Sequence, residues 1–297
     1  MVEGINQNQN PRGYCVLTRS IFRLEGGDRL RYLNGQVSND VSKASAGALI
    51  PACVLTAKGK LCGVIGIHAT SDALILDVDS ALRETLQARL ERYIIADDVS
   101  LTDESDQTHL LHIIGGKMPS GITSRRFGVE GSDFFLSSNE LSRVTEKLRG
   151  EGIEEISPEV LEFHRVRNGI PSWGHELDEN TLPQEALLEQ EAVDFHKGCY
   201  VGQEVVSRIK SVGRVNRLLT GFQANTPLKQ GMEIFSEDNR SRPVGKITSV
   251  SPVFGLSKWI GIGYLKQGSD LPHSALLAID PESGSQADIQ MREFSTH

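Results

Sequence analysis

The sequence predicts an α+β protein that ends in a small antiparallel β-barrel. Its length of 297 residues suggests about two or three domains. In the first half, amphipathic helical patterns alternate with β-prone runs, which favours mixed sheets and helices. In the last 80 residues, short β-prone runs are separated by Gly, Pro, Ser and Asp, a pattern typical of a barrel.

Composition excludes several classes of protein. The net charge of −8 and the pI near 5.5 disfavour bulk nucleic-acid binding, which requires a basic surface. No apolar run approaches the roughly 20 residues of a membrane helix. The polar segment at residues 1–12 lacks the features of a secretory signal, so we expect a frayed tail.

The cysteines argue against a disulfide framework and against a permanent metal centre. Cys15, Cys53, Cys62 and Cys199 are scattered, and no two of them form a Cys-x-x-Cys pair. This spacing does not fit a self-sufficient zinc or iron–sulfur site. Together with the absence of a signal pattern, it predicts a protein of the reducing cytoplasm.

The segment from about residue 15 to 48 predicts one strand and one short helix. The strand covers Ser20 to Leu24. Asp28 can cap a helix that carries Leu30 and Leu33 on one face and ends at Gly35. A polar turn follows at residues 36–41.

The block from about residue 50 to 150 predicts an α+β sandwich of ferredoxin-like type. It contains a hairpin around residues 57–60 and helices that begin at Ser80 and at Asn139, the second of which ends at Gly150. The predicted strands cover residues 54–56, 61–69, 73–78, 110–114 and 134–136.

The segment from about residue 151 to 217 contains the candidate chemistry. Ser157 and Pro158 predict a helix start, Gly169 predicts its end, and His164 falls on its apolar side as a core or boundary residue. An acidic loop follows. Its irregular spacing favours a solvated loop over a metal site for four residues: His175, Glu176, Asp178 and Glu179. In the last segment, strands are expected at residues 218–222, 233–235, 244–250, 259–265 and 275–279.

The run from Lys197 to Glu204 is the most informative part of the chain. It brings together a cation, the thiol of Cys199 and two glycines that permit unusual backbone angles or close approach. Lys197 would favour the thiolate if the two side chains converge. Without that convergence, the run is a tight turn into a helix, with Cys199 as a small buried hydrophobe.

Basic residues are locally dense around this run. The cluster could receive a small anion, or it could be a solvated helix face. It consists of Lys197, Arg208, Lys210, Arg214 and Arg217.

Several motifs together resemble the YgfZ family of folate-binding proteins, which is similar to the aminomethyltransferase (T-protein) of the glycine cleavage system. The Lys-Gly-Cys-Tyr-x-Gly-Gln-Glu run is specific to the YgfZ branch. Other matching segments are Arg-Asn-Gly-Ile-Pro at 167–171, Gly-His-Glu-Leu at 174–177, Leu-Pro-Gln-Glu at 182–185, Tyr-Leu-Asn-Gly-Gln-Val-Ser-Asn-Asp-Val at 32–41 and Leu-Thr-Ala-Lys-Gly-Lys at 55–60.

The resemblance implies three domains in a ring around a central cleft for tetrahydrofolate. Residues 1–49 and 151–217 would form a discontinuous folate-binding domain. Residues 50–150 would form an inserted ferredoxin-like domain, and residues 218–297 the C-terminal barrel.

The resemblance also implies which residues bind the folate. Glu185 matches the T-protein glutamate that holds the pterin ring, and Arg214 matches a T-protein arginine. A carboxylate suits the adjacent N–H donors of the ring, and cations suit its anionic glutamate tail. Further candidates are Trp173, which could stack on the pterin or plug a domain junction, and the cations Lys197 and Arg208. Cys199 is the expected active thiol, within the motif residues Lys197, Gly198, Cys199, Tyr200, Gly202, Gln203 and Glu204.

One departure separates this chain from the transferases. Thr85 falls where they carry the aspartate needed for methylene transfer, and it cannot accept a proton as an anion. The resemblance therefore implies a tetrahydrofolate-dependent factor that supports assembly or repair of iron–sulfur enzymes, which would be its transient partners. We expect a cytoplasmic monomer that binds neither nucleic acid nor membrane. The alternatives are a folate-dependent aminomethyl- or methyltransferase, and a non-catalytic folate-binding scaffold with a structural Cys199.

Overall fold

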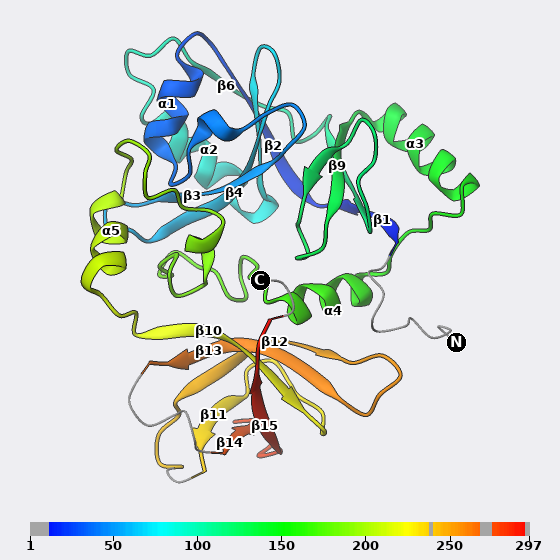
Figure 1. Cartoon of the computed structure of the whole chain (residues 1–297), viewed down its shortest axis with the longest axis vertical. Coiled ribbons are helices and arrows are strands. Elements are labelled where there is room, and N and C mark those ends of the chain that lie inside the picture. Colours follow the sequence, from blue (N-terminus) through cyan, green and yellow to red (C-terminus); the bar gives the residue numbers. More distant parts are fainter. Residues whose placement is uncertain (1–11, 238–239, 268–274, 295–297) are drawn as a thin grey trace.

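The computed structural model describes residues 12–237, 240–267 and 275–294. It confirms the predicted α+β class and the C-terminal barrel: two antiparallel sheets with their helices lie on one side of helix α4, and a closed barrel lies on the other (Figure 1). The tail predicted at residues 1–12 falls outside the described residues, apart from Arg12.

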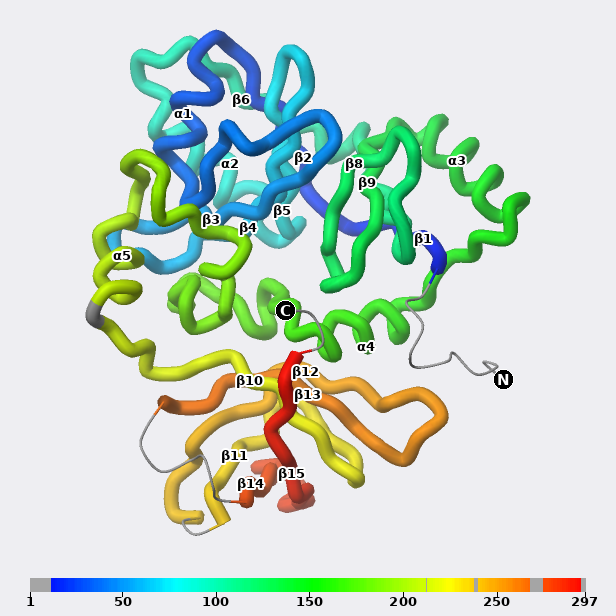
Figure 2. Tube along the Cα trace, viewed as in Figure 1, coloured from blue at the N-terminus to red at the C-terminus, as the bar shows by residue number. Residues whose placement is uncertain are grey.

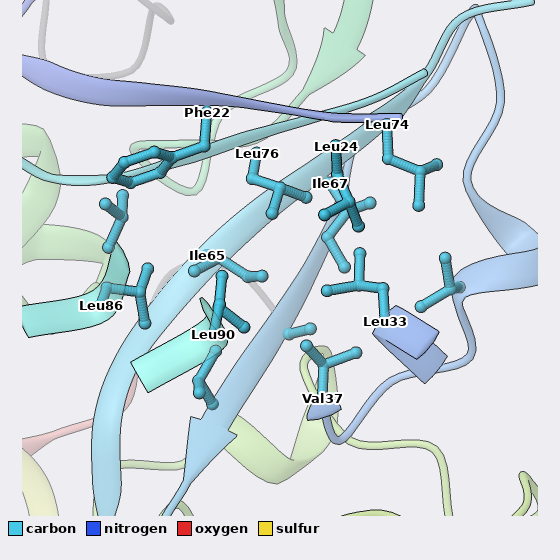
Figure 3. Packing of buried hydrophobic residues seen from close by; sticks show 14 of the residues in the cluster. Phe22, Leu24, Leu33, Val37, Ile65, Ile67, Leu74, Leu76, Leu86 and Leu90 are labelled. Atoms are coloured by element: carbon cyan, nitrogen blue, oxygen red, sulfur yellow. The ribbon is translucent and has the colours of Figure 1, made fainter. Parts of the chain in front are cut away.

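The first sheet has five strands in the order β3-β4-β5-β2-β6. Helices α1 (Arg29–Gln36) and α2 (Arg83–Glu91) cover one face, where alternate strand residues such as Phe22 and Leu76 pack against Leu33 and Leu86 (Figure 3). The strand bounds are β2 Arg19–Glu25, β3 Ile50–Leu55, β4 Leu61–Ala69, β5 Leu74–Asp79 and β6 Ser100–Asp103.

The second sheet has the order β1-β7-β9-β8, and helix α3 (Ser138–Gly150) packs on one face of it. Leu148 of α3 shares a buried cluster there with Tyr14 and Leu111. The strands are β1 Gly13–Leu17, β7 His109–Ile114, β8 Ile122–Ser124 and β9 Gly131–Leu136.

A buried charge network joins the remaining faces of the two sheets. Arg126 donates to both carboxylate oxygens of Asp77 at 2.9 and 2.8 Å and to Asp133 at 2.8 Å. Arg19 also donates to Asp77, and His112 contacts Asp133 at 2.7 Å. Both aspartate side chains are fully buried, so each charge is matched inside the protein.

The sheets do not follow the domain boundary predicted at residue 50. Strands of the 50–150 block, expected in one ferredoxin-like unit, are divided between the two sheets, and each sheet takes a strand from before residue 50. The reason is that Phe22 and Leu24 of β2 supply apolar side chains to the core under α1 and α2, so β2 lies between β5 and β6.

Two predicted helix starts are displaced. The helix expected at Ser80 begins as a 3-10 turn capped by Asp79, which accepts from the Ala81 amide, and α2 starts at Arg83. Helix α3 is capped by Ser137 rather than Asn139, because Ser137 and Glu140 form a capping box.

Helix α4 (Pro158–Asn168) begins and ends where predicted, with Gly169 in the left-handed conformation after its last turn. His164 is buried, as expected. Phe163 and Val166 pack on Leu219 and Ile262 of the barrel. The barrel strands, in the order β10-β13-β12-β11-β14-β15, are β10 Arg217–Ala224, β11 Glu233–Ser236, β12 Gly245–Pro252, β13 Trp259–Lys266, β14 Leu276–Ile279 and β15 Gln286–Arg292.

Candidate functional site

The loop formed by residues 191–202, here called the motif loop, is attached to the end of α1 by hydrogen bonds. Asp194 donates its amide to the Ser38 carbonyl at 3.0 Å, and the Val201 amide donates to Gly35 at 3.2 Å. The Ser38 hydroxyl donates to the Ala192 carbonyl at 2.6 Å. Two sequence motifs more than 150 residues apart therefore form one structural unit, beside β3 and β4 in Figure 2.

Lys197 is the strongest link between the two segments. Its Nζ donates to the carbonyls of Asn34 at 2.6 Å, Val37 at 2.7 Å and Asn39 at 2.8 Å. An ammonium has three N–H donors, so none remains for a folate carboxylate. This geometry departs from the expectation that Lys197 binds folate or contacts the Cys199 thiolate.

The predicted hairpin at residues 57–60 packs against the end of the motif loop. Gly202 has a φ of +90°, and a Cβ there would lie 2.7 Å from the Thr56 carbonyl oxygen. Gly59 has a φ of +73°, and a Cβ there would lie 2.9 Å from the Val205 side chain. Glycine is needed at both positions because both the backbone angle and the close contact exclude a side chain.

Helix α5 (Gln203–Val212) continues directly from this contact, with Gly202 as its N-terminal cap residue. Gln203 and Glu204 occupy its first turn, where the negative charge of a carboxylate interacts favourably with the positive end of the helix dipole. The motif is thus both a tight turn into a helix and a meeting point of three segments: residues 34–43, residues 55–60 and the motif loop.

Cys199 is the exposed thiol of the protein. Cys15 and Cys53 are buried, and Cys62 is partly buried. Burial raises the pKa of both Cys15 and Cys53 to about 12, so these thiols stay protonated at neutral pH. Exposure contradicts the alternative in which Cys199 is a buried hydrophobe, and it leaves this sulfur accessible to a partner or reagent.

The buried side chain of Tyr200 holds the motif loop against the core. Its ring lies in a buried cluster with Leu55, Leu61 and Val206, which come from the hairpin strands and α5. Burial raises the pKa of its hydroxyl to about 12. Gly198 and Cys199 are therefore held at the surface by a buried residue on their C-terminal side and by Lys197 on their N-terminal side.

Glu185 lies at the junction with the barrel and pairs with Arg217. Arg217 Nε donates to Glu185 Oε2 at 3.0 Å, and its guanidinium lies 4.1 Å from the centroid of the Tyr264 ring. Glu185 is 7% exposed. Within the described residues, its Oε1 has no hydrogen-bond partner, so the carboxylate keeps an acceptor available.

The sequence places Arg217 in the basic cluster and does not indicate its contact with Glu185. Its role at Glu185 depends on where β10 begins, three residues after Arg214, and sequence spacing does not show which arginine turns toward the carboxylate. The signal that could have found it is the sequence Gly-Arg-Val-Asn-Arg at residues 213–217, which carries a second arginine three residues after Arg214, at the position where β10 begins.

The other candidate residues lie near the motif loop or near the Glu185–Arg217 pair. Arg208 on α5 and Arg214 after its end are exposed, and neither forms an ion pair with another described residue. Trp173 is partly buried and packs against the cores on both faces of the first sheet, which fits a plug at a junction. Gln184 Nε2 donates to the Val206 carbonyl at 3.0 Å and so connects the Glu185 turn to α5.

The acidic loop at residues 173–185 corrects one expectation. Glu176 is not solvated; its side chain is fully buried and accepts from Arg165 at 2.8 Å and from Thr248 and Ser249 of β12. Burial opposes its ionisation, but Arg165 and the two hydroxyls outweigh this and lower the pKa of the carboxyl. Glu176 therefore joins α4 to the barrel. Sequence spacing could not show this, because the partners lie 11 to 73 residues away.

No group of three or more His, Cys, Asp or Glu side chains in the part of the chain that the structure describes is arranged to hold a metal ion. None of the helices within it is long and apolar enough to cross a membrane.

Comparisons with known proteins give consistent relatives. No family model matches the chain. It is 27% identical over 238 residues to a mitochondrial iron–sulfur cluster assembly factor IBA57 homolog of Mycosarcoma maydis, covering 70% of this chain and 57% of that relative. It is 24% identical to the tRNA-modifying protein YgfZ of Sodalis glossinidius, covering 91% and 89% of the two chains.

A solved structure shares the fold. The glycine cleavage system aminomethyltransferase T of Bartonella henselae superposes with a TM-score of 0.84, covering 98% of this chain and 88% of that one at 14% identity. At this identity the likeness defines the fold alone.

Proposed function

Since the chain belongs to the YgfZ family and has the fold of the glycine cleavage aminomethyltransferase, we propose that it is a tetrahydrofolate-dependent protein that supports assembly or repair of iron–sulfur enzymes. Cys199 is its acting thiol, and its partners are iron–sulfur enzymes or their assembly factors, met transiently. The observation that carries the proposal is that three motif segments converge to hold one exposed thiol.

The residues present fit a folate. Its pterin ring presents adjacent N–H donors, and Glu185 offers a buried carboxylate with Oε1 open and Oε2 fixed by Arg217. Its glutamate tail is anionic, and Arg208 and Arg214 are exposed cations on the neighbouring segment. Glu185 would orient the ring, and the arginines would hold the tail.

Cys199 supplies the sulfur chemistry. A thiolate binds iron directly, so this exposed sulfur could ligate a partner's cluster transiently. It could also attack a disulfide of a partner, which breaks that S–S bond, forms a mixed disulfide and releases the other cysteine as a thiolate. The cluster is cargo in this proposal. The described residues provide no second set of ligands that would retain it.

Folate binding is tested by titrating tetrahydrofolate into the wild type and Glu185→Ala. Loss of a charge-assisted hydrogen bond costs about 1.5–3 kcal/mol, so affinity should fall roughly 10- to 150-fold. Glu189→Ala, four residues away in the same segment, is the matched control and should bind normally. Equal affinity of Glu185→Ala and the wild type would remove Glu185 from the site.

The thiol is tested in cells that lack this protein. Cys199→Ser should fail to restore the activity of an iron–sulfur enzyme, whereas Cys62→Ser should restore it. Full activity with Cys199→Ser, together with intact folate binding, would instead support the scaffold alternative in which the thiol is structural.

The shared fold favours one other candidate, a folate-dependent aminomethyltransferase. Thr85 weighs against it, since its hydroxyl donates to the Leu82 carbonyl at 3.3 Å within the first turn of α2 and carries no charge. Steady turnover of a methylamine donor with tetrahydrofolate would support the transferase; its absence, alongside folate binding, would support the repair role.

A further inference from the structure

The Lys197 ammonium occupies a cage in which its hydrogen-bond partners are all backbone oxygen atoms. Three carbonyls, from Asn34, Val37 and Asn39, lie 2.6 to 2.8 Å from Nζ and use all its donors. Asn34 lies in the last turn of α1, and Val37 is the residue that caps it. Carbonyls at a helix C-terminus have no partner within the helix and carry partial negative charge, so a cation is favoured there.

The acids near this cage are engaged elsewhere. Asp194 forms an ion pair with Lys43 at 2.6 Å, and Asp40 accepts from Ser42. The aromatic face of Tyr200 lies 5.1 Å from Nζ and completes the surroundings. Lys197 is therefore held by dipoles and a ring, and its ammonium points away from solvent toward the end of α1.

From this geometry we propose that Lys197 is a positioning residue: it docks the motif loop on the C-terminal end of α1 and thereby fixes the place of Cys199, without setting the acidity of the thiol. The inference rests on the proposed role of Cys199 as the acting thiol. It explains why a lysine precedes the cysteine by two residues, because Lys197 fixes the loop backbone close to Cys199.

The two roles of a lysine next to a thiol predict different measurements. A lysine that activates the thiolate lowers the pKa of the thiol, and its removal shifts the pH midpoint of alkylation upward by about a unit or more. A lysine that docks the loop leaves this midpoint in place. Its removal instead weakens the backbone hydrogen bonds between the loop and residues 34–39.

The experiment measures both quantities on the full chain with Lys197→Met. Iodoacetamide alkylation of Cys199, followed by peptide mass spectrometry from pH 6 to 10, should give a midpoint within about 0.3 pH units of the wild type. Amide hydrogen exchange at Asp194 and Val201, which bond to Ser38 and Gly35, should become at least about tenfold faster.

Lys43→Met is the matched control, since Lys43 binds the same loop through an exposed ion pair with Asp194. It should change the exchange rates less than about twofold. A second variant, Lys197→Ala, tests the cage itself: added n-propylammonium should restore slow exchange, whereas n-propanol should not, because only the ammonium donates to three carbonyls.

A midpoint that rises by a unit or more in Lys197→Met, with unchanged exchange, would overturn the inference and make Lys197 a thiolate activator. Both outcomes are measured separately from the tests of the proposed function, which are folate binding and the activity of Cys199→Ser in cells.

Discussion

Arg126 and Lys197 are both partly buried cations that join distant segments, but the protein neutralises them differently. Arg126 lies between two buried carboxylates, Asp77 and Asp133. Lys197 donates all three of its hydrogen bonds to backbone carbonyls and forms no ion pair with another described residue. Burial opposes the charge of Arg126, yet the two aspartates raise its pKa, whereas burial lowers the pKa of Lys197 to about 8, with Asp40 and Asp194 acting in the opposite sense.

The difference is that Arg126 stays ionised near neutral pH, whereas Lys197 can lose its proton there. Charges matched by charges inside a protein stay ionised through the neutral range and hold the two sheets together. A cation matched by dipoles is close to its deprotonation point and holds a surface loop. The contact that holds the two sheets together is thus a charge-matched network, and the contact that holds the loop beside Cys199 is a cation matched by dipoles.

The largest effect is expected for Arg126→Met. It leaves two buried carboxylates with only Arg19 and His112 nearby, and breaking a buried ion pair costs about 3–5 kcal/mol. Urea unfolding should show this loss. Arg125→Met, at the exposed neighbouring position, should stay within about 0.5 kcal/mol of the wild type. Equal stabilities would mean that the network does not hold the sheets.

A buried base without any charge partner extends the comparison. His164 is 3% exposed, and its Nε2 has no hydrogen-bond partner among the residues that the structure describes. Burial, helped by Arg167, lowers its pKa to about 4, below the 6.5 of an unfolded histidine. The unfolded chain therefore takes up the proton first, so stability is lost as the pH falls from about 6.5 toward 4.

The shift corresponds to about 3 kcal/mol between pH 7 and pH 4. Comparing urea unfolding of the wild type and His164→Phe at both pH values isolates this contribution, since the variant should lack it. His109→Gln, at a hydrogen-bonded surface position, should retain the wild-type pH dependence. If His164→Phe retains it too, His164 does not carry the acid sensitivity.

Lys197→Met should cost less than Arg126→Met, about 1–2 kcal/mol. Three carbonyls lose their donor, but the cost of burying the ammonium disappears with it. Urea unfolding measures the difference. Lys43→Met should cost at most about 1 kcal/mol, because its ion pair is exposed. If Lys197→Met lowered the free energy of unfolding as much as Arg126→Met does, the proposed difference between the two cations would be wrong.

The smallest effect concerns a neutral donor. The Tyr264 hydroxyl donates to the Glu176 carbonyl at 2.9 Å at the junction of the barrel and the acidic loop. Tyr264→Phe should lose about 1 kcal/mol in thermal unfolding, the usual value for one neutral hydrogen bond. A loss above about 3 kcal/mol would show that this bond supports the whole junction.

Local sequence signals predicted local structure well. Ser157, Pro158 and Gly169 gave the bounds of α4, and turn residues gave most of the barrel strands. Short strands with weak patterns were missed: β1, β6, β8 and β15. The place of β2 inside the first sheet was also missed, because strand order depends on pairing between distant segments, which periodicity does not encode.

In the candidate site, too, local geometry was predictable from the sequence and contacts between distant segments were not. The glycines of the motif indicated special backbone geometry, and Gly202 has it. The partners of Lys197 and Glu176 were not predictable, since each binds atoms that the fold brings from far along the chain. The folate role of Glu185 stays a prediction, now with Arg217 added as the residue that fixes one of its oxygens.

The position of β1 also has a consequence for how the chain is made. Tyr14 in β1 pairs with Ile113 of β7 on one edge, and on the other it exchanges backbone hydrogen bonds with Glu154 and Ile156. On the ribosome, this strand must wait for about 140 further residues, on the order of ten seconds at usual rates of synthesis. The edge that pairs with β7 is open for about 100 of these residues and the other edge for all of them, so this part of the nascent chain should depend on chaperones more than the barrel, whose strands lie within residues 217–292.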